Sequence, residues 1–320
     1  MADDIYTAIA EKEEIERGGE ERGDISAEQT PYNKEEYAAR KKAEREDAYA
    51  EIERATERIS TDPVAFNDYL SVMARFPRYS VANTLLIFEQ MPEATRLGDF
   101  ETWKRQGASV KQGQKALVIL EPGDEYTRDD GSIGVSYNVK KVFNERQTSA
   151  RHLEPRHPDM RTLLLSLIEA SPVSIKTVDV LDEGNKMAVY NHDSKTITVA
   201  KGLDEQPLFK ALAIQVAQAT LAQQADNAAY SYEANKDTAQ LAAYVVTGRY
   251  GVDNPAVMPV LASQAPDGTP VDTRAELTRI RETAKTISDR MDKSLEATRP
   301  QQEAAHALKP QSRGERDDSR

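Results

Sequence analysis

Charged and apolar residues are distributed unevenly along this 320-residue chain, which predicts that the folded core lies in its middle. Residues 1–61 read as an acidic tail followed by a charged helix, and residues 256–320 as a charged helix, at 273–296, with a polar tail. Segments so poor in apolar side chains cannot bury enough surface to offset the entropy lost on ordering. We therefore expect charged helical or disordered extensions at both ends, and two small domains between them.

The composition excludes several kinds of site. The chain has no cysteine, so disulfides, thiolate nucleophiles and cysteine-bound zinc are ruled out, and a reducing compartment suits it. The acidic start has no apolar stretch typical of a signal peptide. No apolar run approaches the roughly 20 residues that span a bilayer. These features predict a cytoplasmic protein without membrane insertion.

The net charge of −12 argues against a generally basic nucleic-acid binder, but the charge is not uniform. Residues 1–60 hold 18 acidic and 10 basic side chains, a net of −8. Residues 75–146 hold 11 basic and 10 acidic side chains, and many of the acids fall in the short segment EPGDEYTRDDG. A local basic face is therefore compatible with the acidic total.

Residues 62–150 alternate between helical and strand patterns. Asp62 and Pro63 are suited to start a helix that Pro77 ends, and a second helix runs to Gln90. A short helix stopped by Gly107 precedes a buried strand at 116–120, a turn at 129–132 and an alternating strand from 135. The alternation shifts phase near residues 142–143, which indicates a bulge there. This pattern predicts an α+β domain.

A second α+β domain is expected at 161–255, after a proline-containing linker at 151–160. A helix at 160–170 and a strand at 174–180 come first. Strands at 188–191 and 196–199 then form a hairpin, and helices at 207–225 and 232–250 follow.

Three segments of the first domain are distinctive: RYSVANTLLIFEQMPEA, DFETWKRQGASVKQGQKALVILEP and VFNERQT. Their characteristic positions are Ser80, Asn83, Leu86, Ile87, Gln90, Trp103, Gly107, Val110, Lys111, Gly113, Pro122, Val142, Phe143, Gln147 and Thr148. In these positions the domain resembles the N-terminal domain of ArdC-type antirestriction proteins, which also occurs in conjugation-associated proteins of plasmids and other mobile genetic elements. This resemblance implies binding of single-stranded DNA without strong sequence preference.

The residues of this domain are compatible with such binding, because cations can hold phosphates while aromatic rings stack on bases. Basic and aromatic side chains interleave between residues 75 and 146. The expected DNA-binding residues are Arg75, Arg78, Tyr79, Asn83, Gln90, Trp103, Lys104, Arg105, Lys111, Lys115, Lys140 and Arg146.

Structural alternatives stand beside several of these assignments. A lone tryptophan such as Trp103 is more often a core anchor than a stacking platform. Asn83 and Gln90 share one helical face and could satisfy buried backbone groups instead. The stronger candidates for DNA contact are Tyr79, Lys104, Arg105, Lys111 and Lys115.

The second domain resembles a zinc peptidase that lacks its metal-binding residues. The resemblance implies a helix with a His-Glu-x-x-His motif, in which two histidines bind the metal and the glutamate activates water. Here the histidine positions fall on Ile214 and Gln218, the glutamate position on Gln215, and the third ligand position on Gln240. None of the four suits its role. We expect a degenerate metallopeptidase-like domain with no metal, cofactor or catalytic residue; an ordinary core helix is the alternative.

Two functions follow from these observations. The first is a nonenzymatic single-stranded-DNA-binding protein of a mobile genetic element, acting in conjugative transfer or antirestriction, with single-stranded DNA and a relaxase or other conjugation protein as expected partners. The second is a protein–protein adaptor in the DNA-transfer machinery, with an inactive peptidase-like domain.

Overall fold

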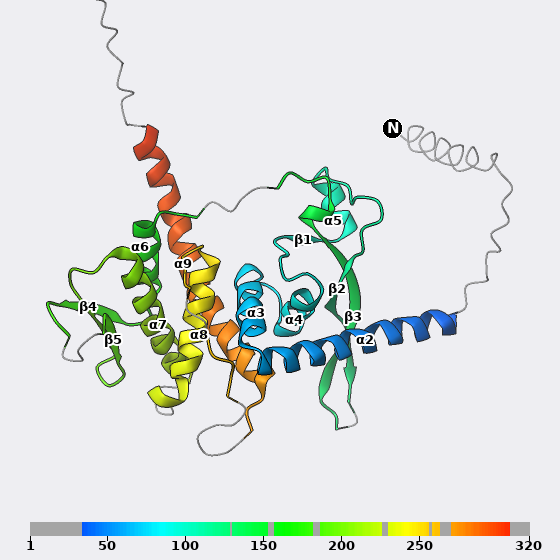
Figure 1. Ribbon diagram of the computed structural model, residues 1–320, viewed down its shortest axis with the longest axis horizontal. Coiled ribbons are helices and arrows are strands. Elements are labelled where there is room, and N and C mark those ends of the chain that lie inside the picture. Colours follow the sequence, from blue (N-terminus) through cyan, green and yellow to red (C-terminus); the bar gives the residue numbers. More distant parts are fainter. Residues whose placement is uncertain are drawn as a thin grey trace, which may run out of the picture. The chain divides into compact units, whose positions relative to one another are not determined.

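The computed structural model describes residues 34–128, 130–152, 157–181, 186–225, 230–255, 258–262 and 270–307 (Figure 1). The chain divides into two units, Met1–Ala43 and Glu44–Arg320. Of the first unit, only the beginning of helix α2 (Lys34–Thr61) lies within the described residues. The expected tails at 1–33 and 308–320 lie outside them, and so does Asp129 of the expected turn. All that follows concerns the second unit.

Three helices build the front of this unit, and the one after Asp62 begins where the sequence predicts. The Asp62 carboxylate accepts a hydrogen bond from the Val64 N–H (2.8 Å) and caps α3 (Pro63–Arg75). Ser80 caps α4 (Val81–Gln90) in the same way. Helix α2 packs more firmly than its charged sequence indicated, because one stripe of its apolar residues is fully buried: Ala48, Ile52, Ala55 and Ile59.

A three-stranded antiparallel sheet lies beside these helices, in the order β1-β3-β2. Its strands are β1 (Leu97–Gly98), β2 (Leu117–Thr127) and β3 (Ile133–Asn144), with helix α5 (Phe100–Arg105) after β1 and the 3₁₀ turn η1 (Glu145–Gln147) after β3. The register shift falls between Pro122 and Glu125 on β2. The bulge expected at residues 142–143 was therefore misplaced: the phase change there reflects burial of Val142 and Asn144 on the side where β1 joins β3.

The side-chain amides of α4 close the outer edge of β2. The Asn83 amide donates to the Leu120 carbonyl (2.8 Å) and accepts from the Leu120 N–H (2.7 Å). Two turns further along the same face of α4, the Gln90 amide donates to the Val118 carbonyl (2.9 Å) and accepts from the Val118 N–H (2.7 Å). Each amide imitates the backbone of a neighbouring strand, so the edge is satisfied without another strand.

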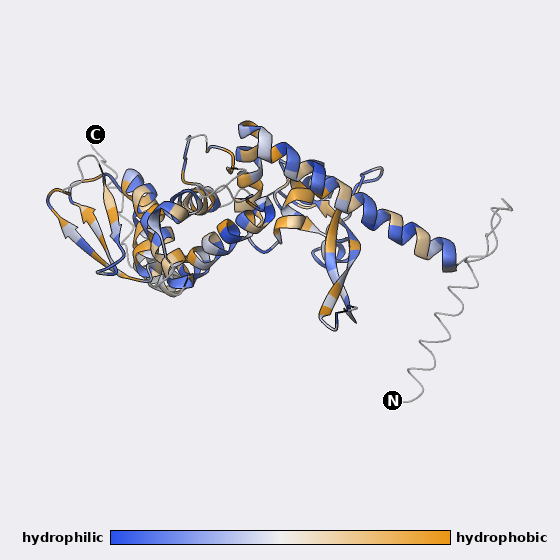
Figure 2. Ribbon diagram, turned by 90° about the horizontal axis from the view of Figure 1, so that it is seen from below, coloured by the Kyte–Doolittle hydropathy of each residue, from blue (hydrophilic) through white to orange (hydrophobic). Residues whose placement is uncertain are grey.

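Beyond Leu120, the two strands continue as an arm, residues 121–138, which projects past α2 in Figure 1. The strand expected at 116–120 is thus much longer than its buried part. Figure 2 shows hydrophobic residues along the arm, where four large side chains are exposed: Tyr126, Ile133, Val135 and Tyr137. Ile133, Val135 and Tyr137 alternate along β3 and therefore share one face.

The rear of the unit combines helices with a second small sheet of order β4-β6-β5. Helix α6 (Met160–Ala170) precedes β4 (Ser174–Val178), β5 (Ala188–Asn191) and β6 (Thr196–Ala200). The expected hairpin joins β5 to β6, while β4 pairs with β6 in parallel. Helices α7 (Glu205–Gln224) and α8 (Tyr232–Arg249) follow, and the mixed architecture confirms the α+β class.

The last helix, α9 (Thr273–Ala307), is longer than the helix expected at 273–296 and belongs to the core. Its five buried apolar side chains are Leu277, Ile280, Ala284, Ile287 and Met291. It packs against α6, α7, α8 and α4. Arg281 also donates to the carbonyl oxygens of Tyr79 (2.5 Å) and Pro77 (3.3 Å), so α9 holds the front and rear parts together. No helix in the described part of the chain is long and apolar enough to cross a membrane.

Asn83→Asp tests the role of the α4 amides. The carboxylate keeps the acceptor for the Leu120 N–H but loses the donor and faces the Leu120 carbonyl, so we expect a loss of about 1–3 kcal/mol in the free energy of unfolding. Urea titration at neutral pH measures it. Asn138→Asp, at an exposed position of the arm, is the matched control and should change stability by less than about 0.5 kcal/mol. Equal effects of the two substitutions would contradict the edge-closing role.

Candidate nucleic-acid interface

Trp103 is a core anchor rather than a surface platform. Its side chain is 1% exposed, and the indole N–H donates to the Phe143 carbonyl on β3 (3.0 Å). The Arg96 guanidinium lies 4.8 Å from the ring centroid. Gly98 permits this packing, because a Cβ at that position would lie 3.0 Å from the indole nitrogen. Trp103 therefore fixes α5 on the sheet and presents no face to a base.

Asn83, Gln90 and Arg75 are also engaged within the protein. The Asn83 and Gln90 amides bind the β2 backbone, so they satisfy backbone groups as the alternative to DNA contact predicted. The Arg75 guanidinium donates to the carbonyl oxygens of Ala94 (2.9 Å) and Pro92, and its burial lowers its pKa. These three side chains hold the front domain together.

Lys140 lies between two carboxylates. Its ammonium group is 3.0 Å from Asp99 and 3.2 Å from Glu121, and the hydrogen bond to Asp99 raises its pKa. Asp99 also caps α5: hydrogen bonds from Thr102 and then the contact with Lys140 lower its pKa to about 2. The charge of Lys140 is thus largely compensated.

Tyr79 is half-buried at the N-terminal side of α4. Its ring packs edge-on against Phe76, with centroids 5.6 Å apart, and burial raises its pKa. The charges of Lys140 and Asp99 both act on its hydroxyl group. Arg78, beside it, is exposed.

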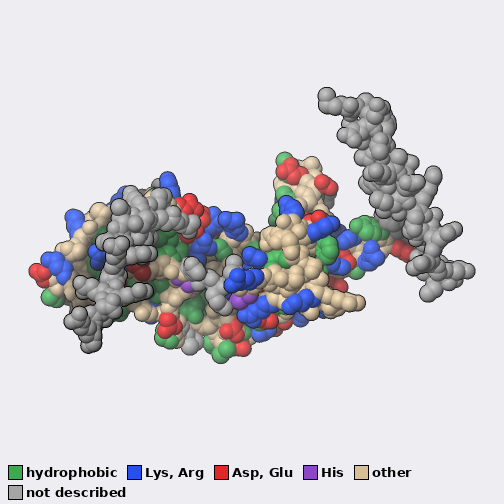
Figure 3. Space-filling model, turned by 90° about the horizontal axis from the view of Figure 1, so that it is seen from above, with side chains coloured by type: hydrophobic (Ala, Val, Ile, Leu, Met, Phe, Trp, Pro, Cys, Tyr) green, Lys and Arg blue, Asp and Glu red, His purple; other side chains and the backbone are tan. Residues whose placement is uncertain are grey.

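Five other predicted cations lie at the surface and form no salt bridge among the described residues, although the charge of Lys115 acts on the Glu51 carboxyl group of α2. We call them the cationic face: Lys104, Arg105, Lys111, Lys115 and Arg146. Backbone contacts bring their segments together. The Lys111 ammonium group donates to the Arg146 carbonyl (2.9 Å), and the Gln147 amide donates to the Lys115 carbonyl (2.7 Å). Figure 3 looks onto the side of the molecule where α5 lies and shows Lys and Arg side chains gathered there.

A buried polar cluster beneath this face fixes η1. The carboxylate of the buried Glu145 accepts from the Thr95 hydroxyl (3.0 Å) and contacts His152, and it lies 3.6 Å from Arg96. The sequence analysis missed these residues, because the pairing of Glu145 with side chains at 95, 96 and 152 depends on the tertiary fold. It also missed the exposed Phe100, whose four-residue spacing from Lys104 was a readable signal.

In the rear part, the four positions of the expected metal site perform other tasks. Gln215 accepts a hydrogen bond from the Tyr190 N–H of β5 (2.8 Å), and the buried Gln218 accepts one from the Tyr230 hydroxyl. Ile214 is half-buried and Gln240 is exposed. The residues that the structure describes contain no group of three or more His, Asp or Glu side chains able to hold a metal ion. The relation to peptidases stays a prediction.

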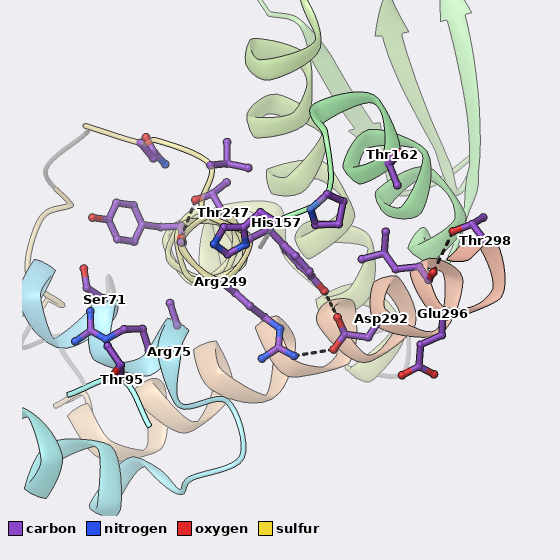
Figure 4. A pocket seen from close by; sticks show the side chains of 18 residues that line it. Ser71, Arg75, Thr95, His157, Thr162, Thr247, Arg249, Asp292, Glu296 and Thr298 are labelled. Carbon is purple, nitrogen blue, oxygen red and sulfur yellow. Dashed lines mark hydrogen bonds and ion pairs between the residues drawn. The ribbon is translucent and has the colours of Figure 1, made fainter. Parts of the chain in front are cut away.

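A cavity of about 810 Å³ lies between the front and rear parts (Figure 4). Arg75 lies on one side of it, and His157 and Arg249 on the other. Arg249 is neutralised by Asp292 at 2.6 Å, and Asp292 also accepts from the Tyr250 hydroxyl at 2.7 Å. The charge of Arg249 is therefore balanced within the cavity.

Residues 46–152 match the family model of the N-terminal domain of the anti-restriction factor ArdC. This segment is thus similar to the ArdC N-terminal domain. The match starts at Glu46, within α2, ahead of the expected domain start at residue 62. The buried stripe of α2 explains this earlier start, since the helix completes the core of the domain. The whole cationic face lies inside the matched segment.

Over most of its length, the chain is also similar to an uncharacterized protein of Bacillus anthracis, with 22% identity over 325 residues. The alignment covers 82% of this chain and 54% of the relative, so the chain spans about half the length of that protein. Among solved structures it is similar to the antirestriction protein ArdC of plasmid R388 at 16% identity. The alignment with the metal-free form covers 67% of this chain and 86% of the ArdC chain, with a TM-score of 0.40. The alignment with the Mn(II)-bound form covers 75% of this chain and 97% of the ArdC chain, with a TM-score of 0.45.

Because Asp99 caps α5 as a carboxylate, the free energy of unfolding should depend on pH in the acidic range. The pKa of Asp99 in the folded state, about 2, lies below the ordinary 3.8, so its contribution is complete above pH 4 and is lost as the pH falls through 2. Asp99→Asn should therefore lower the melting temperature at pH 7, and the difference from wild type should shrink between pH 4 and 2. Thermal unfolding followed by circular dichroism measures it. A difference that stays constant over this range would contradict the assignment.

Proposed function

We propose that this protein binds single-stranded DNA without sequence preference, as a nonenzymatic factor of a mobile genetic element that acts in antirestriction or conjugative transfer. One observation carries the proposal: the five side chains of the cationic face are exposed and form no salt bridge within the described chain, although the protein carries a net charge of −12. Phosphates can take the place of the missing partners. The family of the front domain supports the same conclusion.

The buried anchors support the proposal by holding this face in one shape. Trp103 fixes α5, and the Glu145 cluster fixes η1, so the cations stand on rigid elements. A preformed face binds with less loss of side-chain and loop entropy than a mobile one. The overall negative charge outside the front domain limits indiscriminate contact with nucleic acid.

Replacing Lys104 and Arg105 together by Ala tests the proposal. We expect weaker binding of a labelled 20-nucleotide strand in fluorescence anisotropy. The slope of log affinity against log salt should fall by about 1.4, since each phosphate contact contributes about 0.7 for single strands. Lys176→Ala with Lys293→Ala is the matched control, because it removes two exposed charges from the rear part. Unchanged binding by the Lys104/Arg105 variant, or equal losses in both variants, would refute this interface.

The rear part is proposed to be chemically inert. Glutamine amides are poor zinc ligands beside imidazole, and Gln215 and Gln218 are already hydrogen-bonded to Tyr190 and Tyr230. We expect purified protein incubated with zinc and then dialysed to keep no stoichiometric metal in elemental analysis. One tightly held zinc per chain would contradict this part of the proposal.

The second candidate, a protein–protein adaptor in the transfer machinery, is favoured by the arm. Tyr126, Ile133, Val135 and Tyr137 expose apolar surface on a projecting hairpin, and acidic residues accompany them. Phosphates are repelled by such a surface, while a basic protein such as a DNA-processing partner is attracted. The two roles use different surfaces and are compatible in one molecule.

A further inference from the structure

Helix α5 presents one aromatic ring to solvent, and it is not the ring of Trp103. Phe100, at the start of the helix, is 56% exposed, while Trp103 one turn later is buried. Phe100 is four residues from Lys104, so the two side chains share the outer side of the helix. The Thr102 N–H donates to the Asp99 carboxylate and the Trp103 indole N–H donates to the Phe143 carbonyl, and these bonds already hold α5 in place. The position of α5 therefore does not depend on Phe100, and its exposed ring can contact another molecule.

A single exposed hydrophobic residue needs no explanation by itself, so the surroundings of Phe100 decide its meaning. Lys104 and Arg105 follow on the same helix, exposed and without a carboxylate partner in the described residues. An apolar protein partner would have to bury these two charges at a cost. A nucleotide instead offers a flat base for the ring and a phosphate for each cation.

A second ring lies close to the same place. Asp99, the neighbour of Phe100 in sequence, is paired with Lys140, and both charges act on the hydroxyl group of Tyr79. Tyr79 in turn follows the exposed Arg78. The Asp99–Lys140 ion pair therefore lies next to Phe100 in the chain and near enough to Tyr79 for its charges to act on that hydroxyl group.

We propose that Phe100 is the base-stacking residue of this protein, and that Lys104 and Arg105 hold the phosphates next to the stacked base. The inference rests on the proposed function and deepens it. Stacking on an exposed ring requires a base that is not already stacked between its neighbours in a duplex. The ligand that we infer is therefore an unpaired strand. It also explains tolerance of sequence, because every base has a flat face.

The experiment compares two labelled strands of equal length and charge, one of thymidines and one whose sugars carry no bases. Phe100→Ala should bind the thymidine strand roughly 5- to 150-fold more weakly than wild type, the range expected for one stacked base. Its affinity for the strand without bases should not change. Phe100→Trp should keep the wild-type affinity for thymidines, and Phe100→Leu should lose it, although leucine keeps an apolar side chain.

Controls separate stacking from folding and from charge. Val64→Ala removes a side chain on α3 that is 67% exposed, and it should alter neither affinity. The Lys104/Arg105 double variant should lose affinity for both strands alike. Far-ultraviolet circular dichroism reports whether each variant is folded.

Each result decides the inference. If Phe100→Ala binds thymidines like wild type, or weakens both strands equally, Phe100 does not stack on bases, while the proposed function stands. If wild type binds neither strand at low salt, the proposed function fails and this inference fails with it. Equal binding by the Leu and Trp variants would show an apolar contact instead of stacking and would overturn the assignment.

Discussion

The front domain depends on the closing of one sheet edge by a helix. An unpaired strand edge leaves backbone N–H and C=O groups without partners, and each such group is costly when water is excluded. Asn83 and Gln90 lie two turns apart on one face of α4, and their amides bond to the backbones of Leu120 and Val118 on β2. These bonds set the position of β2, and β3 follows from its pairing with β2. Everything that carries the cationic face is then attached to β3 or to the turn after it.

The rear part repeats this device with a single amide. Gln215 of α7 accepts a hydrogen bond from Tyr190, which lies on β5 at the edge of its sheet. The position at which a peptidase-like helix would carry a catalytic glutamate thus has a structural task here. A glutamine suits it, because it accepts the bond without placing a charge beside the strand.

The sequence predicted element boundaries well where a local signal sets them. Asp62 with Pro63, Ser80 and Gly107 mark helix ends through caps and fixed backbone angles, which are properties of a few neighbouring residues. The class of the fold and the family of the front domain were also predicted correctly. The length of β2 was not, since its outer half is stabilised by pairing with β3 and shows no buried pattern of its own.

The candidate interface was predictable in its cations but not in its ring. Lysines and arginines are solvated by default, so their exposure could be expected from composition alone. Which aromatic side chain of α5 turns inward depends on how the helix is rotated about its axis. The hydrogen bond from Trp103 to Phe143 and the close approach permitted by Gly98 set that rotation, and both come from the tertiary fold.

The arm has a consequence for how copies of this molecule behave at high concentration. Its two strands pair with each other, and beyond Leu120 no described strand covers their outer sides. The exposed strand edges of such a hairpin can pair with those of another copy and lead to aggregation, and the exposed Ile133 and Val135 favour this pairing. The carboxylates of Asp124, Glu125 and Asp130 bring like charges together whenever two hairpins meet. Acidity in this segment thus protects solubility, and the same residues that keep DNA away keep the molecules apart.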